Sequence, residues 1–240
     1  MTKYLNIHYW IRKILVNKII SKIFSKKFIN KTIFVSIYKS NYWNKSKEFN
    51  PISQSYSGPG SIPNSKQTNH LILNLEKFFL NYDIKKILDA PCGDCAWIEG
   101  LFKMKIEYTG IDIVNELILK NKNKFQKNQN INFFCEDLID YNKYNGYDFI
   151  LLRDFFIHLP IKNIQNILNN LKKSDCKFYA FNNYESITIN KEISTGQHRK
   201  INLMEKPFDL EKPFLKIQEV KNDNFPDKNI IDNFLYIYKN

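Results

Sequence analysis

From residue 67 onward, short apolar strands alternate with amphipathic helices, and this alternation restricts the chain to one broad fold class. The expected helices carry apolar residues every three or four positions, as at Leu71, Leu75 and Phe78. Strands that alternate with helices form a parallel sheet with helices on both faces. The expected strands are Lys86–Ala90, Glu107–Ile113, Ile131–Cys135, Tyr147–Arg153 and Lys177–Asn182, and the expected helices are Gln67–Leu80, Trp97–Lys103, Val114–Gln126 and Ile161–Lys173.

Two further apolar segments, Phe214–Val220 and Phe234–Tyr238, lie near the end of the chain. No helical pattern separates them, so we expect them to pair as an antiparallel hairpin at one edge of the sheet. The sequence therefore predicts a Rossmann-like, doubly wound, mostly parallel α/β sheet with a C-terminal antiparallel hairpin. A chain of 28.7 kDa is large enough to bury the core of such a domain.

The first fifth of the chain differs from the rest in charge. Residues 1–47 hold 11 Lys and Arg and no Asp or Glu, whereas residues 48–240 hold 25 Lys and Arg against 24 Asp and Glu. Through residues 10–31, apolar residues recur in pairs every four to five positions, with basic residues between them. This spacing predicts a basic amphipathic helix with a break near Ser25. Such a helix can pack on its own domain, lie on an anionic membrane surface or bind a partner.

A segment rich in Gly, Pro and Ser separates this helix from the alternating elements. It contains Ser57-Gly58-Pro59-Gly60-Ser61, although the whole chain has only seven glycines. The composition favours either a simple turn or a loop that closes over a ligand. The predicted organisation is a basic helical extension over residues 1–48, this loop over residues 49–66 and one α/β domain over residues 67–240.

Composition narrows the classes of function. A formal charge of +12 is typical of nucleic-acid-binding proteins, but residues 48–240 carry a net charge of only +1, which disfavours a nucleic-acid partner. No apolar run exceeds five residues, so no helix is expected to span a membrane. Four scattered cysteines and the lack of a secretory-signal pattern favour a cytoplasmic protein with neither a disulfide framework nor a metal.

Four consecutive predicted strands end in, or lead directly into, an acidic residue. The second of these acids follows Gly93 by nineteen residues. Because ligands of doubly wound sheets bind at the carboxyl ends of the strands, we expect all four acids to lie at one site. They are Asp89, Asp112, Asp137 and Asp154.

This pattern suits a nucleoside-containing ligand with a positive charge. The glycine of Cys92-Gly93-Asp94 allows a ligand close to the backbone, and an acid about 20 residues later can accept hydrogen bonds from both ribose hydroxyls. A third carboxylate can accept from an adenine amine. Acids around Gly93 repel a pyrophosphate but attract an ammonium or sulfonium, which disfavours NAD, FAD and ATP. The alternative is that Asp89 and Asp112 only cap the helices that follow them.

Four motifs occur in a recognisable order over about residues 55–238. They are the loop 57–61, Leu88-Asp89-Ala90-Pro91-Cys92-Gly93-Asp94-Cys95-Ala96-Trp97, Arg153-Asp154 with His158-Leu159, and Thr195-Gly196 with Arg199 and Asn202. In these motifs the chain resembles the class I S-adenosylmethionine-dependent methyltransferases. It is most similar to a bacterial subgroup associated with surface and capsular polysaccharide modification. Pro91 and Cys95 stand where the general family usually has glycines.

The resemblance implies the class I methyltransferase fold, with S-adenosylmethionine as cofactor. Because the methyl group of a sulfonium is already activated, such an enzyme mainly aligns the acceptor and removes its proton. The residues expected to bind the cofactor are Asp89, Pro91, Cys92, Gly93, Asp94, Asp112, Ile113, Asp137, Leu138 and Arg153.

The segment after the fourth strand supplies the expected catalytic residues. His158 is the expected base, because imidazole titrates near neutrality, and Asp154 is expected one helical turn away, orienting His158 or the substrate. The alternative is that His158 only ends this segment before Pro160. The residues expected to bind the substrate are Ser57, Gly58, His198 and Arg199.

The resemblance further implies an O-methyltransferase with a small acceptor. The acceptor would be a sugar hydroxyl or phosphate-type group of a surface-polysaccharide precursor, anionic or nucleotide-linked. Residues 10–31 could then hold a cytoplasmic enzyme at the inner face of the cell membrane. Two alternatives stay open: an RNA methyltransferase that uses the basic N-terminal arm, and a non-catalytic scaffold with the same fold that binds no cofactor.

Overall fold

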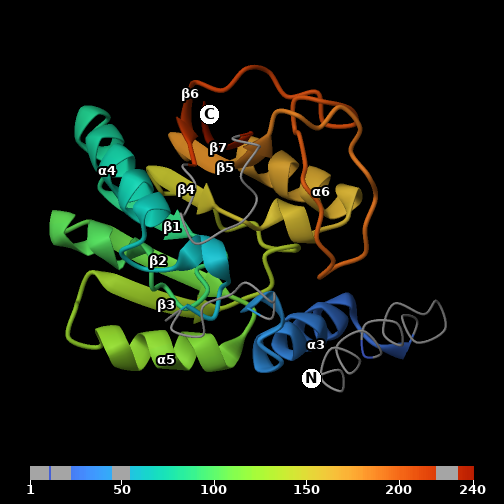
Figure 1. The fold of residues 1–240 in the computed structure, drawn as a ribbon. Helices are drawn as coiled ribbons and strands as arrows, with labels where there is room; N and C mark the ends of the chain where they lie inside the picture. Colours follow the sequence, from blue (N-terminus) through green and yellow to red (C-terminus); the bar gives the residue numbers. More distant parts are fainter. Residues whose placement is uncertain (1–10, 12–22, 45–54, 220–231) are drawn as a thin grey trace.

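The computed structural model describes residues 11, 23–44, 55–219 and 232–240 and has a seven-stranded sheet at its centre (Figure 1). The strand order is β3-β2-β1-β4-β5-β7-β6, with β1 to β5 parallel and β7 antiparallel to both of its neighbours. This confirms the predicted doubly wound, mostly parallel sheet with antiparallel C-terminal strands. The strands are β1 Lys86–Asp89, β2 Glu107–Asp112, β3 Ile131–Cys135, β4 Phe149–Leu152, β5 Phe178–Tyr184, β6 Leu215–Gln218 and β7 Asn233–Lys239.

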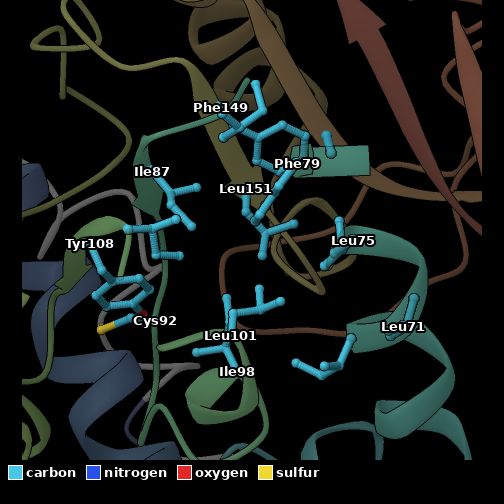
Figure 2. Packing of buried hydrophobic residues seen from close by; sticks show 14 of the residues in the cluster. Leu71, Leu75, Phe79, Ile87, Cys92, Ile98, Leu101, Tyr108, Phe149 and Leu151 are labelled. Carbon is cyan, nitrogen blue, oxygen red and sulfur yellow. The ribbon is translucent and has the colours of Figure 1, made fainter. Parts of the chain in front are cut away.

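Helices cover both faces of this sheet. Helices α4 (Lys66–Asn81) and α5 (Asn115–Phe125) contribute to one core cluster, and α6 (Ile161–Lys172) contributes to the other. The strands supply both clusters because successive side chains point to opposite faces, as Ile87 and Leu88 do. In Figure 2, Leu71, Leu75 and Phe79 from α4 pack toward residues of the central strands. This packing fixes the carboxyl ends of the parallel strands at one edge.

Most expected elements agree with the structure to within two residues, but one changes type. The segment Ile98–Met104, predicted as a short α-helix over Trp97–Lys103, is a 3₁₀ helix, η3. It ends at Lys105, which has a left-handed backbone with φ of 55°. The other short 3₁₀ helices are η1 Tyr42–Asn44, η2 Pro59–Ser61 and η4 Phe156–His158.

The N-terminal helix differs from the predicted one. Helix α3 spans Lys26–Lys39, and the Ser25 side chain caps it by accepting a hydrogen bond from the backbone N–H of Phe28 at 3.2 Å. The predicted break near Ser25 is confirmed, but the helix continues well beyond residue 31. Its apolar residues recur every four positions, and this buried stripe supports the continuation: Ile29, Ile33 and Ile37. Residues 12–22 of the predicted helix lie outside the described residues.

Helix α3 packs on the α/β domain at the edge where the parallel strands end (Figure 1). Tyr38 lies in a small apolar cluster with Val114 and Leu117, and the Lys39 ammonium is 2.9 Å from Glu116 of α5. A Cβ atom placed on Gly196 would lie 2.6 Å from Ile33, so only glycine allows the helix to approach this loop so closely. Of the three interpretations given above, packing on its own domain describes residues 26–39.

Candidate functional site

A pocket opens at the carboxyl ends of β1, β2 and β4 and beside the segment that follows β3. The predicted acids Asp89, Asp112, Asp137 and Asp154 all line it, so the structure brings them together as expected. Apolar side chains from α3 and from the segments after β2 and β3 form much of the remaining wall. These are Phe34, Tyr38, Ile113, Val114, Leu117 and Leu138.

Asp89 lies at the base of this pocket and is almost fully buried. It accepts a hydrogen bond of 2.6 Å from the hydroxyl of Tyr108, a β2 residue that the sequence analysis did not single out. Burial raises the pKa of Asp89 to about 7, although the Tyr108 hydroxyl and the Arg153 charge act in the opposite direction. A positively charged ligand would stabilise the ionised form of this buried carboxyl group, so the environment of Asp89 favours a cationic ligand.

Asp112 is tied to the glycine turn that follows β1. Its Oδ2 accepts from the backbone N–H of Gly93 at 3.1 Å, and its Oδ1 accepts from that of Val114 at 2.8 Å. Each carboxylate oxygen keeps a second lone pair, so the group can still accept from two ligand hydroxyls. Burial raises the pKa of Asp112 to about 6, while these backbone N–H groups lower it. This turn and this acid therefore form one unit.

Gly93 can only be glycine in this turn. Its φ is +53°, and a Cβ atom placed on it would lie 2.1 Å from the Ser57 Oγ. Its carbonyl accepts from the Asn121 side chain at 2.9 Å. The adjacent Pro91 and Cys92 also line the pocket. The turn therefore forms part of the pocket wall even though Pro91 stands where the general family usually has a glycine.

Asp137 receives a partner from outside the predicted domain. Asn30 of α3 donates a hydrogen bond of 3.0 Å to Oδ2 of Asp137, and the backbone N–H of Ile139 donates to Oδ1 at 3.1 Å. Both side chains are buried, and burial raises the pKa of Asp137. Helix α3 therefore closes one end of the pocket and fixes the orientation of this carboxylate. The only signal in the sequence was an asparagine on the apolar side of a basic helix.

The loop 57–61 and the residues just before it lie over the turn that contains Gly93. Asp94, predicted to bind the cofactor, contacts these residues instead. The carboxylate of Asp94 accepts from the backbone N–H of Tyr56 at 2.6 Å and from the Ser57 hydroxyl at 3.2 Å. Asp94 is not among the described residues that line the pocket, whereas Ser57 is. Asp94 thus holds the loop in place, because the backbone N–H of Tyr56 and the hydroxyls of Ser55 and Ser57 donate to its carboxylate. Gly58, predicted to bind substrate, is likewise not among the described residues that line the pocket, and a Cβ atom placed on it would lie 3.4 Å from Cβ of Trp43.

Arg153 was predicted to bind the cofactor, but its guanidinium is engaged by protein groups. It donates to both carboxylate oxygens of Glu219, at 2.9 and 2.8 Å, and to the carbonyl of Gly60 at 3.0 Å. Its Nη1 is 3.2 Å from Asp154, and its guanidinium carbon lies 4.8 Å from the centre of the Trp97 ring. Every branch of its guanidinium therefore has a partner in the protein. Arg153 borders the pocket and joins the end of β4 to the loop 57–61.

The expected pair of catalytic residues has a different geometry from the predicted helical turn. Asp154 has a left-handed backbone with φ of +53°, and η4 begins only at Phe156. The partner of Asp154 is Arg153, whereas His158 shares a hydrogen bond of 2.9 Å with the carbonyl of Gln197 through Nδ1. Burial raises the pKa of Asp154 to about 6. Asp154 therefore does not set the orientation of His158.

His158 lines the pocket as a neutral imidazole. Burial lowers its pKa to about 4, so the expectation that it titrates near neutrality is wrong. A carbonyl partner at Nδ1 assigns the proton to that nitrogen and leaves the lone pair on Nε2. The Trp43 ring lies 5.0 Å and the His198 ring 5.6 Å from the imidazole. Trp43 was missed because the segment 42–44 was assigned to the extension.

His198 and Arg199 adjoin this end of the pocket through His158. The backbone N–H of Arg199 donates to the carbonyl of Ile157 at 3.0 Å, and that of Gly196 donates to the carbonyl of His158 at 2.9 Å. Burial lowers the pKa of Arg199 to about 10 and also lowers that of His198. The structure thus places the segment 195–200 next to His158, and the binding of substrate by His198 and Arg199 stays a prediction.

The two cysteines of the motif at residues 88–97 are free thiols. Cys92 and Cys95 are both buried, and burial raises the pKa of each well above its usual value. Cys95 lies 3.3 Å from the Tyr108 hydroxyl. These properties describe two packed thiols on the apolar side of the turn.

Comparisons with known proteins agree with this geometry. Residues 87–174 match a family model described as a methyltransferase domain. A search of curated proteins found no significant match. Among solved structures, the N-methyltransferase NodS from Bradyrhizobium japonicum WM9 in complex with S-adenosyl-L-homocysteine has a TM-score of 0.56 at 12% identity, covering 85% of this chain and 97% of NodS.

Two other solved structures show the same fold. The magnesium protoporphyrin IX methyltransferase ChlM from Synechocystis PCC 6803, with bound SAM, has a TM-score of 0.55 at 13% identity, over 87% of this chain and 95% of ChlM. The methyltransferase domain of bacterial CtHen1 has a TM-score of 0.54 at 16% identity, over 73% of this chain and 100% of that domain. Residues 87–174 thus match a methyltransferase domain, and the described chain has the fold of the class I methyltransferases, whose cofactor is S-adenosylmethionine.

The residues of the pocket fit this cofactor. The paired lone pairs of Asp112 suit ribose hydroxyls, and the buried carboxyl of Asp89 suits a cationic group. Apolar walls beside Asp137 suit an adenine ring. Among the described residues, no helix has the length and apolar character needed to cross a membrane.

The affinity for S-adenosylhomocysteine should depend on pH through Asp112. The ionised carboxylate accepts from the ribose hydroxyls, so binding favours ionisation, and affinity is retained above the pKa of about 6 and lost as the pH falls through it. Between about pH 7.5 and pH 5, we expect the association constant to fall about tenfold. Calorimetric titration at several pH values measures this fall, and a flat profile would contradict it.

Proposed function

We propose that the protein transfers the methyl group of S-adenosylmethionine to an oxygen atom of a small acceptor held beside His158. The observation that carries this proposal is the neutral, oriented imidazole of His158 in the same pocket as the cofactor-binding acids. An alcohol oxygen becomes a competent nucleophile when a neighbouring base takes its proton in the transition state. An amine acceptor would need no such base once it is unprotonated, so the imidazole supports oxygen rather than nitrogen as the acceptor atom.

The bound cofactor supplies an activated methyl group on a sulfonium. The residues of this chain then align the acceptor and accept its proton. Nε2 of His158 accepts the proton, because Nδ1 is committed to the Gln197 carbonyl. Asp154 lines the pocket beside it and binds the acceptor rather than orienting His158. Ser57 lines the same pocket, which supports the predicted role of Ser57 in binding the acceptor.

Replacing His158 by alanine should leave cofactor binding within about threefold of wild type and lower turnover at least about 100-fold, the effect usual for a general base. His158→Gln, which keeps a polar group of similar reach, should be similarly slow. Binding of S-adenosylhomocysteine by calorimetry and turnover with an identified acceptor are the two measurements. Near-wild-type turnover by His158→Ala would remove the residue from the mechanism.

For the acceptor, we retain a sugar hydroxyl or phosphate-type group of a surface-polysaccharide precursor. The support comes from the four sequence motifs, since Ser57 and Ser61 of the loop 57–61 line the pocket and the segment 195–202 hydrogen-bonds to residues 157 and 158 beside it. The near-neutral charge of residues 48–240 disfavours RNA. A screen of nucleotide-activated sugars and phosphorylated small molecules, read out by formation of S-adenosylhomocysteine, tests this class. Activity on RNA alone would contradict it.

Contact with a membrane surface is a separate proposal for the segment before and at the start of α3. Three apolar side chains, Ile23, Phe24 and Phe28, are exposed there next to Lys26 and Lys27. This arrangement suits the interface of an anionic bilayer. Deleting residues 1–47 would also remove α3 and with it part of the pocket, so a milder change is needed.

Replacing all three exposed apolar residues by serine should lower sedimentation with anionic vesicles at least about fivefold, because apolar burial contributes most of interfacial binding. Unchanged binding of S-adenosylhomocysteine would show that α3 is intact in this variant. Equal, negligible sedimentation of both proteins would refute a membrane role.

A further inference from the structure

Unpartnered hydrogen-bond donors gather around His158. In the described part of the chain, five buried side-chain N or O atoms lack a hydrogen-bond partner, and three of them are N–H donors on two residues. These donors are Nε1 of Trp43 and Nε and Nη2 of Arg199. Buried donors are normally paired, so this concentration at one place calls for acceptor atoms from a ligand.

The two arginines that the structure describes differ in how many of their donors have partners. Arg153 and Arg199 are equally buried, at 5% and 8% exposure. All branches of the Arg153 guanidinium contact protein acceptors, including both oxygens of Glu219. Arg199 has one hydrogen bond, from Nη1 to the carbonyl of Phe156 at 3.3 Å, and the other two nitrogens are unpartnered. Arg153 has its counterion inside the protein, whereas no acid among the described residues contacts Arg199.

Trp43 lines the pocket, and several contacts hold Arg199 against Phe156 and Ile157, next to His158. The segment containing Gly196, Gln197 and Arg199 hydrogen-bonds to the backbone or side chain of residues 157 and 158. Helix α3 presses on the same segment at Gly196. Trp43 lines the pocket and lies against one side of the His158 imidazole, and His198 also contacts that ring. The donors therefore belong to a fixed framework around the proposed base.

We propose that Trp43, His198 and Arg199 form an oxyanion subsite that binds a phosphate or carboxylate group of the methyl acceptor beside His158. This proposal rests on the proposed function, because it names the chemical class of the acceptor. A group with several acceptor oxygens and a negative charge pairs with a guanidinium fork and an indole N–H at once. Neutral sugars offer hydroxyls but no charge to balance Arg199.

The subsite also explains how the acceptor would be selected. An anionic group held by Arg199 fixes one end of the acceptor and leaves a neighbouring hydroxyl to face Nε2 of His158. An uncharged analogue leaves the buried guanidinium unpaired, which penalises its binding. Discrimination between charged and uncharged acceptors should therefore appear mainly in the ratio kcat/KM.

The test uses the full chain saturated with S-adenosylhomocysteine and inorganic phosphate as the probe. Phosphate binding is followed by ³¹P NMR line broadening at constant ionic strength, with acetate in a parallel series to separate phosphate from carboxylate preference. The variants are Arg199→Gln and Trp43→Phe, which remove the guanidinium and the indole N–H and keep a polar and an aromatic side chain, respectively. Lys200→Gln is the matched control, because its ammonium already lies 3.3 Å from Asp232.

We expect saturable phosphate binding by wild type, a loss of at least about tenfold in Arg199→Gln and of about threefold in Trp43→Phe, and a change under about twofold in Lys200→Gln. If Arg199→Gln fails to fold, as shown by lost binding of S-adenosylhomocysteine, Trp43→Phe decides. That variant keeps an aromatic ring beside His158 and lacks the indole N–H donor.

Absence of saturable phosphate and acetate binding by wild type, or equal affinity in wild type and the donor variants, overturns the proposed subsite. Such a result, with tight binding of S-adenosylhomocysteine, would leave the proposed function intact. Failure of wild type to bind S-adenosylhomocysteine would instead contradict the proposed function.

Discussion

Replacing Arg153 by methionine should destabilise the protein by about 3–5 kcal/mol, the usual consequence of leaving one member of a buried ion pair without its partner. The side chains of Arg153 and Glu219 are 3% and 1% exposed, and two hydrogen bonds join them. Asn182 and Gln67 also donate to Glu219, but neither carries a charge. For a chain of this length, we expect a fall in Tm of about 10 °C.

A paired substitution separates this effect from loss of packing. In the double variant Arg153→Met with Glu219→Leu, both charges of the fully buried pair are gone and only the partly exposed Asp154 loses its partner, so much of the lost stability should return. Thermal unfolding of wild type, the single variant and the double variant measures this recovery. A drop in Tm below about 2 °C for Arg153→Met would contradict the assignment of Arg153 to a buried structural pair.

The same variants address the role that the sequence motif suggested for Arg153. An arginine that binds the cofactor would lose affinity in both variants, whereas a structural arginine leaves the affinity of the folded double variant within about threefold. The motif pattern placed Arg153 correctly at a strand end beside the pocket. It could not show that Glu219, 66 residues later, would reach the guanidinium.

The fold could be predicted because its strands are short apolar runs and its helices have clear periodicity. The strand β3 has the predicted bounds, Ile131–Cys135, and α6 differs from prediction by one residue. Such local patterns determine element type, and the rule that parallel strands deliver their carboxyl ends to one edge then brings Asp89, Asp112 and Asp137 together. The acids of the site were predictable because each ends a strand or follows one within two residues.

The contribution of the N-terminal segment could not be predicted in this way. A charge boundary near residue 48 suggested a separate extension, but charge reports the solvent-facing side of a helix rather than what its other side contacts. Asn30, Phe34 and Trp43 reach the pocket through tertiary contacts with Asp137 and His158. The environment of His158 could not be predicted either. Its pKa is lowered by burial, and the spacing of residues along the sequence does not show that this side chain is buried.

Replacing Asp112 by asparagine should weaken binding of S-adenosylhomocysteine about 100-fold, which corresponds to about 2.7 kcal/mol. The carboxylate accepts from the N–H groups of Gly93 and Val114 and retains lone pairs for two ribose hydroxyls. An amide of the same shape has one acceptor oxygen, so it leaves one backbone N–H and one ribose hydroxyl without a partner. Hydrogen bonds to a charged acceptor are also about twice as strong as those to a neutral one.

Two controls distinguish lost ligand contacts from a disturbed turn. Asp140→Asn changes an exposed acid near the same end of the sheet and should alter affinity less than about twofold, since surface charges contribute little. Asp112→Asn should also abolish the fall in affinity between about pH 7.5 and pH 5, because no group with a pKa of about 6 would be left at that position. If Asp112→Asn bound the ligand as tightly as wild type, Asp112 would serve only to cap the helix after β2. An affinity that fell while its pH dependence persisted would assign the titration to Asp89, whose pKa burial also raises.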